Sequence, residues 1–184
     1  MLLLEVEPLD LGPDVKAIGL ELTDPEMDGE PIRGKQAAQI WSRVLPSVAA
    51  NEAWALDFFS HLDRVRSYCE THHIEFRQAS APSIVIADPQ PADLETLLQR
   101  FEAETFGARA GALVSSGDSA LEGDLARTGV DAYQHSFGNY LFCAICDFEN
   151  GSLVLLSAQL WASEVIRRIR PVLNELEVRI QLPI

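Results

Sequence analysis

The sequence feature that most constrains the fold is a pair of strand-like runs separated by Asn150-Gly151. The runs cover residues 140–148 and 152–157, and both are rich in the aliphatic and aromatic residues that strands favour. Asn-Gly is the favoured pair for a type I′ turn, whose twist matches that of two antiparallel strands. The sequence therefore predicts a β-hairpin in the C-terminal half.

Further strands and two helices flank this hairpin. Residues 83–87 form a short apolar run that predicts a buried strand. Pro91 begins a helix with Leu94, Leu97, Leu98 and Phe101 on one face. After the hairpin, a second helix has one apolar face, made of Ala162, Val165, Ile166, Ile169 and Leu173. A closing strand covers residues 177–182. This β-α-β-β-α-β order matches a ferredoxin-like plan with residues 108–136 as an insertion.

The N-terminal part adds strands over residues 2–6 and 15–22, followed by two helices. We expect the first helix to end at Pro46, and the second to begin at Asn51 and carry an apolar stripe from Ala55 to Cys69. The predicted fold class is α+β, a two-layer sandwich of a mostly antiparallel sheet with helices packed on it. No low-complexity linker divides the chain, so we expect one domain over residues 1–184. Subdivision into 1–80 and 81–184 remains an alternative.

The charge of the chain is strongly negative and unevenly distributed. The 184 residues have a formal net charge of −14, and residues 1–30 contain nine acids against Lys16 alone. A phosphate backbone or an anionic lipid surface attracts the opposite charge. We therefore expect neither nucleic acid nor membrane as a partner, and interpret the N-terminal acids as a docking surface for a basic protein.

Three cysteines, an odd and small number, are more typical of a reducing compartment than of a secreted protein. The N-terminus lacks the pattern of a signal peptide, so we expect a cytoplasmic location. Cys143 and Cys146 have metal-ligand spacing, but they lie inside a predicted strand, where positions three apart belong to opposite faces. We expect core cysteines and no metal or other cofactor; zinc binding through this pair is an alternative.

Motifs of known catalytic sites are missing. The sequence contains no G-x-S-x-G nucleophile elbow and no H-E-x-x-H zinc motif. Within the glycine-rich stretch from Gly107 to Gly129, the segment 111–117 is followed by Asp118, where a phosphate-binding loop requires lysine. These observations favour a protein that is not an enzyme.

One polar and aromatic segment before the hairpin is a candidate ligand site. It contains Asp131, Tyr133 and His135, and loops beside a rigid sheet are where binding residues concentrate. Arg168 could add an anion anchor from the following helix. The alternative is that Tyr133 anchors the loop on the core and that Arg168, with its neighbours Arg167 and Arg170, pairs with the chain's own acids.

Two classes of function follow from these features. The first hypothesis is a non-catalytic cytosolic binding or regulatory module that self-associates and presents an acidic N-terminal surface. The second is a small enzyme or small-molecule-binding domain with a pocket near residues 131–137.

Overall fold

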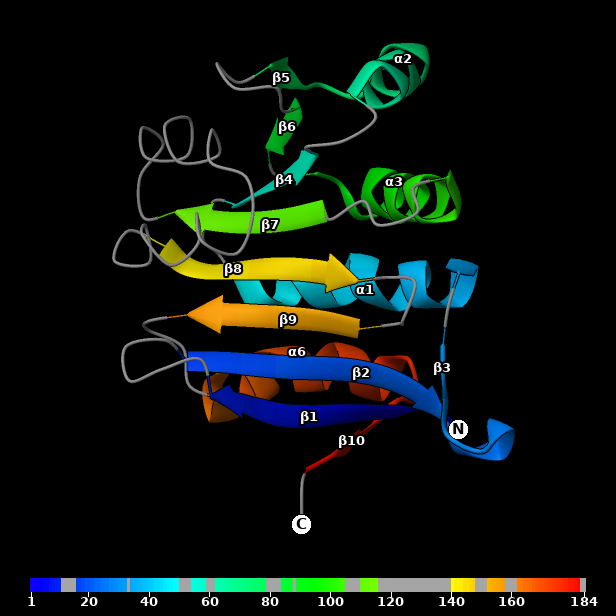
Figure 1. Ribbon diagram of the computed structural model, residues 1–184, viewed down its shortest axis with the longest axis vertical. Coiled ribbons are helices and arrows are strands. Elements are labelled where there is room, and N and C mark those ends of the chain that lie inside the picture. Colours follow the sequence, from blue (N-terminus) through cyan, green and yellow to red (C-terminus); the bar gives the residue numbers. More distant parts are fainter. Residues whose placement is uncertain are drawn as a thin grey trace.

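The computed structural model describes residues 1–10, 16–32, 34–49, 54–58, 62–78, 84–87, 89–104, 110–115, 140–147, 152–157 and 162–182. These residues form one large sheet with helices packed against it (Figure 1). The α+β class predicted from the sequence is confirmed.

The sheet has ten strands, nine of which follow the order β10-β1-β2-β9-β8-β7-β4-β6-β5. Along the chain they are β1 (Leu3–Asp10), β2 (Lys16–Asp24), β3 (Glu30–Pro31), β4 (Trp54–Phe58), β5 (Arg77–Gln78), β6 (Ile84–Ala87), β7 (Ala110–Ser115), β8 (Tyr140–Asp147), β9 (Ser152–Ser157) and β10 (Arg179–Gln181). The short β3 pairs with β2. Among the pairings of the described residues, only that of β1 with β10 is parallel, so the described sheet is mostly antiparallel, as expected.

Two hairpins, each followed by a helix, meet in the middle of the sheet. The hairpin β1–β2 precedes α1 (Gly34–Ala49), and the predicted hairpin β8–β9 precedes α6 (Ala162–Glu175). Strand β2 pairs antiparallel with β9, with Ile18 opposite Leu155. Strands from residues 1–80 and from residues 81–184 therefore pair within the same sheet.

The spatial order of the strands differs from the ferredoxin-like plan. The predicted chain order is present, but β4 and β7 lie between β6 and β8, and β1 and β2 lie between β9 and β10. Strand β7, which belongs to the expected insertion, pairs with β8, and β2 pairs with β9. These pairings therefore do not show the ferredoxin-like arrangement.

The helices α1, α3 (Pro91–Glu104) and α6 lie on one side of the sheet, and the core is between the two layers (Figure 1). Alternate residues of the first hairpin, Leu4 and Val6 on β1 and Leu20 and Leu22 on β2, are buried in this core because successive side chains of a strand point to opposite faces. The predicted apolar faces of α3 and α6 are buried there too, at Leu94, Leu97, Leu98, Val165, Ile166, Ile169 and Leu173. Those two helices are confirmed.

The helical pair predicted between residues 37 and 69 is only partly correct. Helix α1 continues through Pro46 to Ala49, and residues 54–58 form strand β4 instead of the first turns of a second helix. Strand β4 lies between β6 and β7, and its alternate residues Leu56 and Phe58 are buried. Pairing on both sides therefore outweighs the helical spacing of these apolar residues. The second helix, α2, is shorter and covers Leu62–His72.

Helix α6 ends in a conformation that favours glycine, although Glu177 occupies the position. Its φ is 55°, and the amide of Val178 donates to the carbonyl oxygen of Leu173 at 2.9 Å, as in a Schellman cap. A residue with a Cβ in the left-handed conformation costs the folded state roughly 1–2 kcal/mol. Glycine avoids this cost, but part of the gain is lost because glycine makes the unfolded chain more flexible.

We therefore expect Glu177→Gly to raise the free energy of unfolding by about 1 kcal/mol. Urea denaturation of the purified variant measures this change. Glu177→Ala is the matched control, because it removes the same carboxylate and keeps the strained backbone. If both variants were equally stable, the strain argument would be wrong.

Candidate functional site

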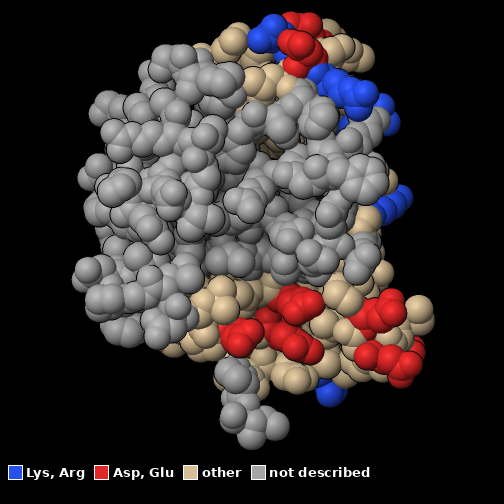
Figure 2. All heavy atoms as spheres, in the orientation of Figure 1, with Lys and Arg blue, Asp and Glu red and all other residues tan. Residues whose placement is uncertain are grey.

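The most distinctive surface in the described part of the chain is a group of carboxylates on the first hairpin. Since Leu4, Val6 and Leu20 face the core, Glu5, Glu7 and Glu21 lie on the opposite face of the sheet. Figure 2, in the same view as Figure 1, shows Asp and Glu side chains gathered over the β1–β2 end of the molecule. We call Glu5, Glu7 and Glu21 the acidic surface.

The strand register brings two of these carboxylates directly opposite each other. Glu5 is the cross-strand partner of Glu21, and Glu7 follows two positions along β1 on the same face. Like charges at directly opposed positions destabilise a sheet. One hydrogen bond offsets part of this repulsion: the Thr23 hydroxyl donates to Glu5 Oε1 at 3.2 Å. The sequence indicated acidity over residues 1–30, but only the register shows which acids are adjacent.

Several acids elsewhere in the described structure have cationic partners. Glu164 pairs with Arg167 and Arg168, Glu175 pairs with Arg43, and Glu26 lies 3.7 Å from the N-terminal amine. Within the described ranges, no ion pair links a basic side chain to Glu5, Glu7 or Glu21. The acidic surface is therefore charged without internal neutralisation from the residues that the structure describes.

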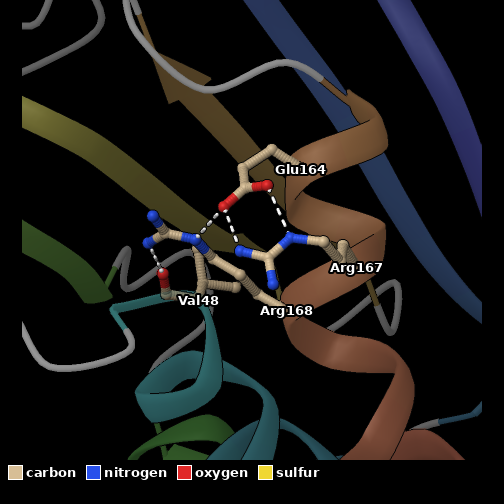
Figure 3. A network of polar contacts seen from close by, with 4 residues as sticks. All are labelled: Val48, Glu164, Arg167 and Arg168. Atoms are coloured by element: carbon tan, nitrogen blue, oxygen red, sulfur yellow. Dashed lines mark hydrogen bonds and ion pairs between the residues drawn. The ribbon is translucent and has the colours of Figure 1, made fainter.

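The predicted ligand site near residues 131–137 is described only at Arg168. Asp131, Tyr133 and His135 lie outside the described residues, so their convergence stays a prediction. Arg168, on α6, is 17% exposed and donates from Nε to Glu164 Oε1 at 2.9 Å and from Nη1 to the carbonyl oxygen of Val48 at 2.7 Å (Figure 3). These contacts favour the alternative in which the arginine pairs with the chain's own groups.

This polar network joins two helices at the back of the sheet. Arg167 donates two hydrogen bonds to Glu164, from Nε at 2.8 Å and from Nη2 at 2.7 Å (Figure 3). Hydrogen bonds from Arg167 and then Arg168 lower the pKa of Glu164 from 4.5 to about 2. Val48 lies in the last turn of α1, whose carbonyls have no partner within the helix. Arg168 thus caps α1 from α6, and we assign this network to stability.

The three cysteines lie on one helix and one strand. Cys69 on α2 is fully buried, and burial raises the pKa of its thiol to about 11, so it is a poor nucleophile at neutral pH. Cys143 and Cys146 both lie in β8, as predicted. In the part of the chain that the structure describes, no group of three or more His, Cys, Asp or Glu is arranged to hold a metal ion.

No protein family, no curated protein and no solved structure matches this chain. The class that the structure defines is an α+β protein with one large mixed sheet and helices against it. None of the helices in the described ranges has both the length and the apolar character needed to cross a bilayer.

Proposed function

We propose that this chain is a cytoplasmic, non-catalytic binding or regulatory module that docks a basic segment of a protein partner on its acidic surface. The observation that supports this most is the group formed by Glu5, Glu7 and Glu21, which share one sheet face and have no cationic partner among the described residues. A partner rich in Lys or Arg would supply the missing countercharge.

Binding of such a segment would also relieve repulsion within the protein. Glu5 and Glu21 oppose each other across β1 and β2, so a cation placed between them is attracted by both. A ligand that binds only the folded state stabilises it by mass action. Charges at an exposed surface mainly control the association rate and the choice of partner. We therefore expect a fast, salt-sensitive interaction that raises the melting temperature.

Titration of an arginine-rich peptide into the full chain, followed by fluorescence anisotropy at two salt concentrations, tests this proposal. We expect saturable binding that weakens with salt, and an affinity loss of about tenfold in the triple variant Glu5→Gln, Glu7→Gln, Glu21→Gln, since each surface pair contributes up to about 1 kcal/mol.

The matched control changes the net charge by the same amount, but at positions outside the acidic surface. Glu70→Gln, Glu75→Gln and Glu95→Gln remove three carboxylates from or near α2 and α3, away from the β1–β2 hairpin. This control should lose less than about twofold in affinity. Equal losses in the two triple variants would show attraction to net charge alone, and the docking site would be wrong.

Self-association is the second part of the proposal, and the geometry indicates which surface it would use. The outermost strands of the described sheet, β10 and β5, have only three and two residues. Short edge strands resist pairing between molecules, so a dimer would use a face rather than an edge. Native mass spectrometry at micromolar concentration should show the dimer; a strict monomer would overturn this part.

A further inference from the structure

We draw no further inference here: the strongest candidate, the face of the sheet opposite α1, α3 and α6, where the strand register places Ala17 beside Leu156 and Gly19 beside Val154, carries nothing because no described residue shows what covers these apolar positions.

Discussion

Replacing Trp41 with alanine should lower the free energy of unfolding by about 3–5 kcal/mol, the cost typical of truncating a large buried aromatic side chain. Trp41 lies near the middle of α1, is 0% exposed, and belongs to the core between the sheet and the helices. Two effects contribute to this loss of stability. The apolar contacts of the side chain are removed, and a cavity remains because the closely packed neighbours cannot move in to fill it. Urea denaturation followed by circular dichroism measures it.

Trp41→Phe separates the two contributions of this side chain. The indole Nε1 is buried and has no hydrogen-bond partner in the described structure. An unpaired buried donor costs about 1–3 kcal/mol, and phenylalanine removes it while keeping most of the apolar contact. We therefore expect Trp41→Phe to cost less than about 2 kcal/mol. A loss as large as that of Trp41→Ala would mean that the indole N–H is satisfied in solution.

The second large effect is expected at Arg168. Arg168→Met keeps the aliphatic stem but removes the hydrogen bonds to Glu164 and to the Val48 carbonyl oxygen. Hydrogen bonds to charged groups contribute about 1.5–3 kcal/mol, and we expect a loss in that range. Arg167→Met is the matched control, because Arg167 also binds Glu164 but is 71% exposed and, in the described structure, has no hydrogen bond or ion pair with α1. The control should cost less than about 1 kcal/mol.

The same pair of variants has a predictable dependence on pH. Arg167 and Arg168 hold the pKa of Glu164 at about 2, below its usual 4.5, so Glu164 stabilises the fold while it is ionised. That contribution is fully present above about pH 4.5 and is lost as the pH falls toward 2. The stability difference between the wild type and Arg168→Met should therefore shrink over this window. The part due to the Val48 contact should persist, and a difference that grew on acidification would contradict the pairing.

Local sequence patterns predicted several elements of this fold. The runs on either side of Asn150-Gly151 became β8 and β9, Pro91 begins α3, and the apolar face of α6 is buried as expected. The helical spacing of Ala55, Phe58 and Leu62 predicts a helix over residues 54–58. Short apolar segments satisfy both periods, and only the pairing of β4 with β6 and β7 selects the strand.

The candidate sites were less predictable. For Arg168 the sequence leaves two roles open, an anion anchor and a partner of the chain's own acids. Glu164 is only four positions away, but the contact with Val48, 120 positions away, is visible only in the structure. The acidity of the N-terminal part is visible in the sequence, but the strand register that places Glu5 opposite Glu21 is not.

By itself, the sequence determined the α+β class, the hairpin at Asn150-Gly151, the helices α3 and α6 and the acidity of the N-terminal part, because these depend on neighbours within a few residues. The tertiary structure alone decided the strand order, the pairing of β2 with β9, the strand identity of β4 and the cap that Arg168 places on α1. Those features join segments far apart in the chain. They depend on which complete faces and edges fit together once the core closes, and local periodicity does not encode that fit.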